Sequence, residues 1–328
     1  MSGNGVLVVM EKADAGFHRM SFEALAAGQR LALELGQTCS AVVLGESEAV
    51  AALAAELKSK KLETVWEVGC ASLTMYTADA WTAALEQLIA EVSPAYVVFA
   101  HTYRTRDFAP KLATRLGQVL IGDVTAIQVV EGVPVFQRQW MQGKLNAEYR
   151  HKGTGVCFVS VQAGSFRADE VAEGTGEVKA FAPKIDAAAV RTKPGEAFRE
   201  AAQTVDLGNA PVIVSVGRGI GGEENLQIVK DLAEALHAEL AASRPICDAG
   251  WLPMVRQVGS SGQTVSPKLY LAVGISGAIQ HLVGMKGAKT VIAINKDADA
   301  PIFEVADIGV VGDLFEVVPA LTRAIRQG

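Results

Sequence analysis

The sequence predicts an α/β protein of two domains, each built on a mostly parallel sheet flanked by helices. Apolar strand-like runs alternate with helix-like runs over residues 6–116, and the alternation returns over residues 211–327. Between these regions, residues 164–209 lose periodicity and are rich in Glu, Lys, Ala and Pro. Such alternation indicates right-handed βαβ units, and 328 residues exceed one typical α/β domain. We therefore predict domains at residues 1–205 and 206–328, the second of them Rossmann-like.

The first domain opens with strands and helices in strict alternation. Its strands are predicted at residues 6–10, 40–45, 64–69 and 96–100, and its helices near 20–35, 46–57, 78–92 and 106–116. Apolar runs near 123–140 and 155–163 are separated by glycines, so we expect them to add antiparallel strands to the sheet. The first strand ends in Glu11-Lys12 without a glycine-rich turn. This favours a role at a subunit interface over ligand binding.

The second domain repeats the alternation. Strands are predicted at residues 211–216, 238–242, 268–273, 289–294 and 307–311. A helix over 223–238 carries an apolar stripe at three- and four-residue spacing, formed by Leu226, Val229, Leu232 and Leu236. A last helix runs from Leu314 to Gln327, with Val317, Leu321 and Ile325 on one face.

Composition and charge exclude several classes of protein. Half of the residues are hydrophobic and 20% are charged, which is typical of a globular chain. The net charge of −6 argues against a nucleic-acid partner, and no apolar run approaches the roughly 20 residues of a membrane span. The first residues lead almost directly into a strand, so we expect no targeting segment there. The four cysteines, Cys39, Cys70, Cys157 and Cys247, form no CxxC pair, so we expect reduced thiols in a cytoplasmic protein without a zinc site.

Small or polar turns follow the predicted strands of the second domain. In an open parallel sheet, ligands bind in the crevice outside the carboxyl ends of the strands. We therefore expect one large phosphate-bearing ligand at this edge. The turns are Gly217–Gly222, Ser243-Arg244, Gly274–Gly277, Asn295 and Gly312-Asp313.

The first of these turns has the spacing G-x-G-x-x-G at Gly217, Gly219 and Gly222. The spacing allows a tight turn and a close approach of backbone to phosphate. A site for NAD also needs an acidic residue at the end of the next strand to hold the ribose, and Ser243-Arg244 stands there instead. This departure argues against an NAD-dependent dehydrogenase. A glycine-rich turn without a ligand remains the alternative.

Arg244 and the loop at residues 258–262 each have two interpretations. Pro245 is expected to hold Arg244 extended, where its guanidinium can stack on a planar ring and supply positive charge. An ion pair with Asp248 is the alternative. The loop Val258-Gly259-Ser260-Ser261-Gly262 offers hydroxyl donors to a ligand, but it is equally compatible with a solvated turn.

The segment from Gly274 to His281 is the most specific of the second domain. Ser276 is a candidate N-cap, and the small residues after it would let a phosphate approach the start of a helix. His281 is expected about one turn inside that helix. Asn295 and Asp313 end two later strands, where a side chain can bind a ligand hydroxyl or cap the next helix. No nucleophile elbow, Walker lysine loop or paired carboxylates accompany these turns, which suits a protein whose bound cofactor performs the chemistry.

Taken in order, these segments resemble the alpha subunit of electron-transfer flavoproteins. The resemblance is carried by GRG at 217–219, ASRPICDAGWLP at 242–253, QVGSSG at 257–262, VGISGAIQH with AINKD and APIF within 266–307, and DLFEVVPAL at 313–321. More loosely, RDFAPKLATRLG at 106–117 and GDVT at 122–125 extend it over nearly the whole chain.

The resemblance implies one FAD, held mainly by the second domain, and a heterodimer with a beta subunit that carries AMP or a second FAD. It implies a hydrogen bond from Ser261 to flavin N5, His281 at the O2 edge of the flavin, and Arg244 over the ring. Positive charge from Arg244 and His281 would then stabilise an anionic semiquinone. The implied FAD contacts are Arg218, Ser243, Arg244, Val258, Gly259, Ser260, Ser261, Ser276, Gly277, Ala278, Ile279, Gln280, His281, Asn295, Asp313 and Leu314.

Two residues depart from the family pattern. Glutamine is common where Ser260 stands, and lysine where Gln263 stands, so one contact and one positive charge near this loop are expected to be lost.

The resemblance implies a redox carrier without substrate turnover of its own. Its FAD would accept electrons from flavin dehydrogenases and pass them to a quinone oxidoreductase or another acceptor. Two alternatives stay open: the same subunit in an NADH-dependent flavin-bifurcating complex, and a degenerate nucleotide-binding scaffold without redox turnover.

Overall fold

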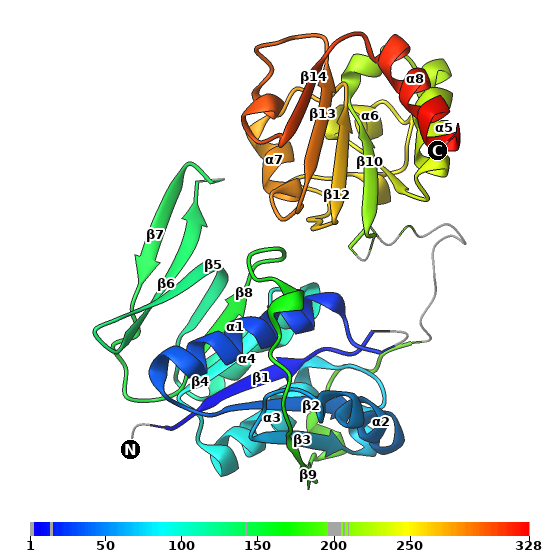
Figure 1. Cartoon of the computed structure of the whole chain (residues 1–328). Coiled ribbons are helices and arrows are strands. Elements are labelled where there is room, and N and C mark those ends of the chain that lie inside the picture. The colour runs from blue at the N-terminus through cyan, green and yellow to red at the C-terminus, as the bar shows by residue number, and fades with distance from the viewer. Residues whose placement is uncertain are drawn as a thin grey trace. The chain divides into compact units, whose positions relative to one another are not determined.

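The chain folds into two α/β units, each on its own sheet (Figure 1). The computed structural model describes residues 3–13, 16–141, 143–195, 205, 207–208 and 210–327. The first unit comprises Met1–Trp140 with Lys144–Ala197, and the second comprises Met141–Gly143 with Phe198–Gly328. Both sheets are mostly parallel and flanked by helices, so the predicted fold class is confirmed.

The sheet of the first unit has nine strands in the order β7-β6-β5-β8-β4-β1-β2-β3-β9. Its parallel centre consists of β1 (Val6–Met10), β2 (Cys39–Gly45), β3 (Thr64–Gly69) and β4 (Tyr96–Ala100). Strand β1 lies between β2 and β4, and it pairs in parallel with both. The winding of the chain therefore reverses between β1 and β4, which is where open α/β sheets form a crevice.

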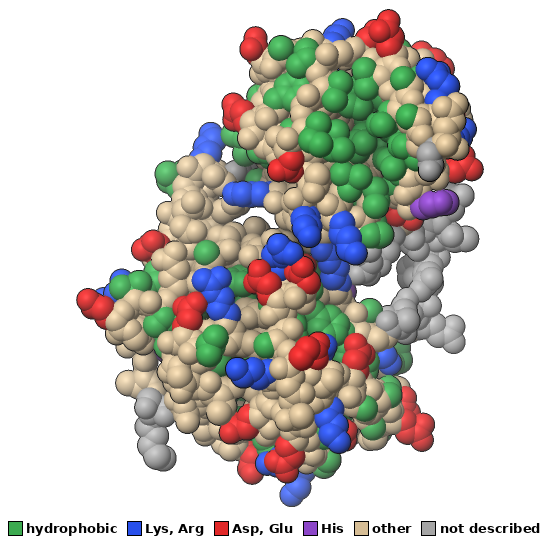
Figure 2. Space-filling model, in the orientation of Figure 1, with side chains coloured by type: hydrophobic (Ala, Val, Ile, Leu, Met, Phe, Trp, Pro, Cys, Tyr) green, Lys and Arg blue, Asp and Glu red, His purple; other side chains and the backbone are tan. Residues whose placement is uncertain are grey.

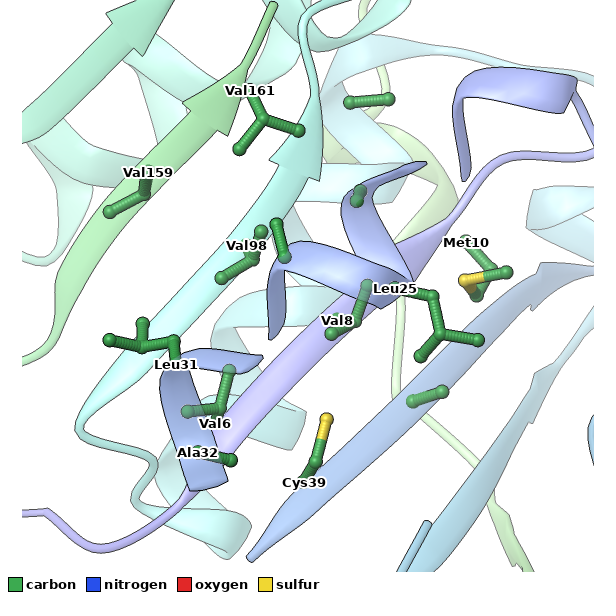
Figure 3. Packing of buried hydrophobic residues seen from close by; sticks show 14 of the residues in the cluster. Val6, Val8, Met10, Leu25, Leu31, Ala32, Cys39, Val98, Val159 and Val161 are labelled. Carbon is green, nitrogen blue, oxygen red and sulfur yellow. The ribbon is translucent and has the colours of Figure 1, made fainter. Parts of the chain in front are cut away.

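Helices cover both faces of this sheet because its strands are apolar on both sides. Helices α1 (Arg19–Leu35) and α2 (Ser47–Leu57) pack on one face, and α3 (Ala78–Val92) and α4 (Tyr103–Arg115) on the other. Successive side chains of β1 alternate between the two cores: Val8 belongs to the first and Leu7 to the second. Figure 3 shows Leu25 and Leu31 of α1 in the first core.

The remaining strands correct the sequence prediction in two places. Strands β5 (Leu120–Val130) and β6 (Val133–Trp140) form the expected antiparallel addition, and β7 (Leu145–Tyr149) extends it beyond the predicted runs. The run near 155–163 was expected to be antiparallel, but β8 (Cys157–Val161) lies between β4 and β5 and is parallel to both. All five of its residues are buried, as in parallel strands covered on both faces.

The second correction concerns the stretch in which the sequence shows no periodicity. Strand β9 (Glu177–Phe181) lies within it and pairs in parallel with β3 at the edge of the sheet. Its residues are exposed or half-buried. Because β9 lies at the edge of the sheet, its sequence lacks the buried apolar pattern from which a strand is predicted.

The second unit has a five-stranded parallel sheet in the order β11-β10-β12-β13-β14. Helices α5 (Leu226–Ala235), α6 (Arg244–Asp248) and α8 (Leu314–Gln327) pack on one face, and α7 (Ile279–Met285) on the other. Numbered along the unit, this order is 2-1-3-4-5, a doubly wound arrangement with its switch point between the first and third strands. The strands are β10 (Val212–Val216), β11 (Glu239–Ala242), β12 (Leu269–Val273), β13 (Val291–Asn295) and β14 (Ile308–Val311).

The edge strand β14 leaves apolar side chains exposed. Ile308 and Val311 keep 53% and 59% of their surface accessible, and Phe315, at the start of α8, keeps 44%. Figure 2 shows hydrophobic side chains gathered on this face of the second unit. Among the described residues, no helix is long and apolar enough to cross a membrane.

Candidate functional site

A large crevice lies at the carboxyl ends of β10, β11, β12 and β13. Its volume is about 780 Å³, within the range of about 300–1,000 Å³ typical of ligand pockets. It straddles the switch point between β10 and β12, where the topology of the sheet predicts a ligand. It is lined by Arg218, Gly219, Ser243, Arg244, Pro245, Gln257, Val258, Gly259, Ser260, Ser261, Gly274, Ile275, Ser276, Ala278, Gln280, His281, Asn295, Asp297, Ala300 and Pro301.

Two glycine turns meet backbone to backbone beside this crevice. The amide of Gly219 donates to the carbonyl of Gly274 over 3.0 Å. A Cβ added to Gly217 would stand 2.3 Å from the Gly274 oxygen, and one added to Gly219 would stand 2.8 Å from the Gly274 Cα. Gly274 itself has φ +63°, a conformation that favours glycine. The glycines therefore bring two strand ends together and keep side chains out of the space between them.

The third glycine of the G-x-G-x-x-G spacing does not belong to this arrangement. Gly222 is not among the residues that line the crevice. After it comes a 3₁₀ turn at Glu223–Asn225, and α5 begins only at Leu226, later than the predicted start at 223. Two carboxylates, Glu223 and Glu224, stand before the helix and would repel a phosphate. The spacing therefore reflects loop packing, and it does not build a phosphate site at the start of α5.

Ser243 and Arg244 leave β11 directly into α6. Ser243 is the N-cap, and Arg244 is already the first helical residue, which corrects the extended conformation expected from Pro245. Proline fits the first turn because its missing N–H would be unpaired there in any case. Nε of Arg244 lies 3.2 Å from Oδ2 of Asp248, and 66% of the arginine side chain is exposed. The arginine thus forms the ion pair and also lines the crevice.

The loop after residue 257 is held by hydrogen bonds to neighbouring segments of the second unit. Ser260 donates its backbone N–H to the carbonyl of Gln280 over 2.7 Å, and Val258 donates to Ala242 over 2.9 Å. The buried amide of Gln257 donates through Nε2 to Oγ of Ser261 over 3.0 Å. That bond occupies the serine oxygen as an acceptor, which leaves the hydroxyl proton of Ser261 available to donate elsewhere.

His281 lies in the first turn of α7, not one turn inside the helix, and only 6% of it is exposed. Its Nε2 is 2.9 Å from the hydroxyl of Tyr270. Burial lowers the pKa of His281 to about 4, against the opposite effect of the Val258 backbone. The ring is therefore neutral at pH 7 in this structure. Desolvation disfavours the charged form, so this structure does not favour the expectation that His281 supplies a positive charge.

Three other predicted residues have structural partners. Ser276 is not the N-cap of α7, which is Ala278; its carbonyl accepts a hydrogen bond from Ile302 instead. Asn295 lines the crevice and donates through Nδ2 to the carbonyl of Ile275 over 2.9 Å. Asp313 accepts from the amide of Phe315 over 2.9 Å at the start of α8, so it acts there as a helix cap.

The crevice brings together most of the residues predicted as FAD contacts. Four predicted residues lie outside its lining, namely Gly277, Ile279, Asp313 and Leu314. Gln257 lines it but was absent from the prediction. No sequence signal distinguishes a buried glutamine that orients a neighbouring serine from one that caps a turn. No group of three or more His, Cys, Asp or Glu residues that could hold a metal ion is found in the described part of the chain.

Comparison with known proteins extends these observations to the whole chain. Residues 6–186 match the sequence model described as "Electron transfer flavoprotein domain", and residues 206–286 match "Electron transfer flavoprotein FAD-binding domain". The chain is 38% identical over 327 residues to electron transfer flavoprotein subunit alpha of Bacillus subtilis, covering 99% of this chain and 98% of that protein. It belongs to the electron transfer flavoprotein alpha subunit family.

Two further members of the family show similar agreement. The subunit alpha of Thermoanaerobacterium thermosaccharolyticum is 37% identical over 324 residues, covering 98% of both chains. That of Mycobacterium leprae is 37% identical over 323 residues, also covering 98% of both. The family resemblance found in the sequence is therefore confirmed along the length of the chain.

The crevice of this family member fits a flavin nucleotide by its own geometry. Gly219 and Gly274 line the crevice with backbone alone, and their mutual packing leaves no room for a side chain at either position. The imidazole of His281 offers a buried nitrogen, Nδ1, without a hydrogen-bond partner among the described residues. Arg218 and Arg244 place positive charge on the lining, as a phosphate-bearing ligand requires.

Proposed function

We propose that this chain holds one FAD in the crevice of its second unit and carries electrons between flavin enzymes. The observation that carries the proposal is the position of the crevice, at the switch point of a unit that matches the FAD-binding domain of the family. Bound FAD supplies the chemistry, since its ring accepts and releases single electrons. The protein binds and orients the cofactor and controls the charge around it.

The residues of the crevice have distinct roles in this proposal. Arg244 would face the flavin ring and favour negative charge on it. Ser261, oriented by Gln257, would donate a hydrogen bond from its hydroxyl to flavin N5. Ser243, Ser276 and the neighbours of Ser276 lie along the pyrophosphate and ribityl chain.

We further propose that the chain functions as a heterodimer with a beta subunit that carries AMP or a second FAD. Its relatives are named as alpha subunits. Exposed apolar surface at Ile308, Val311 and Phe315 is of the kind that proteins bury against a partner. Donors would be flavin dehydrogenases, and the acceptor a quinone oxidoreductase or another protein. All four cysteines are free thiols, which fits a cytoplasmic location.

The test is an ultraviolet–visible spectrum of the chain co-purified with its beta subunit, recorded during stepwise anaerobic reduction. The proposal expects a flavin spectrum that passes through a red, one-electron-reduced anion. Reduction by NADH alone would favour the flavin-bifurcating alternative. A colourless protein that takes up no FAD would refute the proposal and favour a scaffold subunit without redox turnover.

A further inference from the structure

Behind the crevice, a tyrosine and a histidine are joined by a buried hydrogen bond. Tyr270, on β12, is fully buried, and its hydroxyl oxygen lies 2.9 Å from Nε2 of His281. The ring centroids are 6.1 Å apart and the ring planes are inclined by 60°. His281 is among the residues that line the crevice and Tyr270 is not. The phenol therefore reaches a ligand only through the imidazole.

The direction of this hydrogen bond follows from the other partners of the phenol. Ser215, on the adjacent strand β10, is a second polar side chain near it. The Ser215 hydroxyl lowers the pKa of Tyr270, as a hydrogen-bond donor to the phenol oxygen does, and it has no other hydrogen-bond partner among the described residues. A proton on Nε2 would have to donate to Tyr270, and the phenol's own proton would then have no acceptor. Because an unpaired buried donor is costly, the phenol donates to Nε2.

The protonation of both groups agrees with this direction. Burial raises the pKa of Tyr270, so the phenol keeps the proton that it donates. Burial lowers the pKa of His281 to about 4, so the imidazole carries a single proton at pH 7. With Nε2 acting as the acceptor, that single proton is on Nδ1.

We propose that Tyr270 is a positioning residue that holds neutral His281 as the tautomer protonated at Nδ1. Nδ1 is buried and makes no hydrogen bond of good geometry among the described residues, although the Val258 backbone, which raises the pKa of the imidazole, lies beside the ring. Its N–H is then a donor reserved for an acceptor atom of the ligand in the crevice. The ligand's identity rests on the proposed function, since the carbonyl oxygens of a flavin ring are acceptors of this kind. His281 therefore acts as an oriented neutral dipole, and not as a counter-charge.

The tautomer is measured by nitrogen-15 NMR of the full-length chain labelled at histidine, at pH 7.5, before and after addition of FAD. His281→Gln, which removes one pair of ring signals, assigns the resonances. We expect a pyridine-type signal for Nε2 and a pyrrole-type signal for Nδ1, already present without FAD. Protonation at Nε2, or at both nitrogens, would overturn the proposal.

Tyr270→Phe removes the donating oxygen and keeps the ring. Without it, both neutral tautomers of His281 become accessible, and the two nitrogen shifts move toward an average value. If the populations become equal, the donor-competent fraction falls from about 1 to about one half, and FAD binds about twofold more weakly. Tyr96→Phe, on β4 of the first unit, is the matched control and should change neither the shifts nor the affinity. Unchanged His281 shifts in Tyr270→Phe would contradict the proposed role of the phenol.

The two proposals fail separately. If the chain binds no FAD, the proposed function is refuted. Its nitrogen-15 spectrum would still show which nitrogen of His281 is protonated. The wild-type spectrum decides the tautomer even if Tyr270→Phe does not fold. If the chain binds FAD while Nε2 of His281 is protonated, the proposed electron-carrier function is retained and the proposed role of Tyr270 is refuted.

Discussion

The two units of this molecule contain the same topological crevice and use it differently. In the second unit, the switch point between β10 and β12 opens into a cavity of about 780 Å³. In the first unit, the corresponding switch point lies between β1 and β4. Side chains of the unit itself stand at that point.

In the first unit, an arginine stands beside the switch point. Arg104 lies 5.0 Å from the ring centroid of Tyr76 and 5.4 Å from that of Trp81. Its Nε is 3.7 Å from Oε1 of Glu11, and the hydroxyl of Thr102 donates to the other oxygen of Glu11 over 2.6 Å. Glu11 directly follows β1, and Thr102 is the second residue after β4. The first unit therefore neutralises its own strand ends and stacks its own cation on aromatic rings.

The difference teaches that the residue after the first strand of a doubly wound sheet decides the use of the crevice. Gly217 follows β10 and lets the Gly274 turn approach within backbone contact. Glu11 follows β1 and recruits Arg104 and Thr102. Topology provides the location in both units, and side-chain volume and charge determine whether a ligand can enter.

The largest expected effect comes from forcing apart the two glycine turns beside the open crevice. In Gly217→Val, the new Cβ meets the Gly274 oxygen at 2.3 Å, which is backbone that cannot turn away. We expect the free energy of unfolding to fall by about 3 kcal/mol and FAD binding to be lost, measured by denaturant titration and flavin fluorescence. Gly195→Ala is the control, since its Cβ would meet nothing within 4 Å. Retention of FAD by Gly217→Val with wild-type affinity would contradict the role of this glycine.

A second effect of similar size is a pH dependence of the unfolding free energy, which His281 at the open crevice should cause. The pKa of His281 falls from 6.5 to about 4 in the folded chain, so the unfolded state binds more protons between these values. Stability is complete above pH 6.5 and is lost as pH falls toward 4, by about 3 kcal/mol in total. The difference in unfolding free energy between wild type and His281→Gln should follow this window. A difference that stays constant from pH 4 to 7 would rule it out.

A third comparison ranks the polar groups around the proposed FAD. Removing a nearby charge by Arg244→Ala should lower the first-electron reduction potential by on the order of 100 mV. Removing one neutral hydrogen bond by Ser261→Ala should lower it by about 40 mV. Partial exposure of Arg244 and its ion pair with Asp248 reduce the first value toward the second. Anaerobic spectroelectrochemistry measures both, and equal potentials in wild type and Arg244→Ala would show that this arginine does not act on the ring.

The smallest expected effect tests the filled crevice. Arg104→Ala removes two ring contacts and a half-buried ion pair, which should lower the free energy of unfolding by about 1–2 kcal/mol. FAD affinity and potential should stay at wild-type values. The opposite pattern, with stability unchanged and flavin properties shifted, would mean that the two crevices are not separate in function.

Much of the fold could be predicted because its strands are continuous apolar runs between amphipathic helices. β1, β3 and β4 begin and end where the sequence places them, since both faces of these strands are buried. The sequence does not distinguish parallel from antiparallel pairing of β8, because a short, fully buried run of residues has the same pattern in both. β9 was missed because an edge strand has no buried face.

The candidate site shows the same division between local and tertiary information. Turns at strand ends located the crevice, because topology converts their positions along the chain into a shared edge. The protonation of His281 could not be predicted, since it depends on burial and on Tyr270, eleven residues away. The orientation of Ser261 by Gln257 likewise depends on the geometry of one folded loop.

The position of β9 has a consequence for the synthesis of the protein on the ribosome. β9 pairs with β3, although the chain between Gly69 and Glu177 is made in the interval. At about 5–20 residues per second, that interval lasts roughly 5–20 s. During it, the backbone of β3 along that edge has no neighbouring strand, and other nascent chains can pair with it. The late synthesis of β9 thus ends the period in which this edge of the nascent sheet is unpaired.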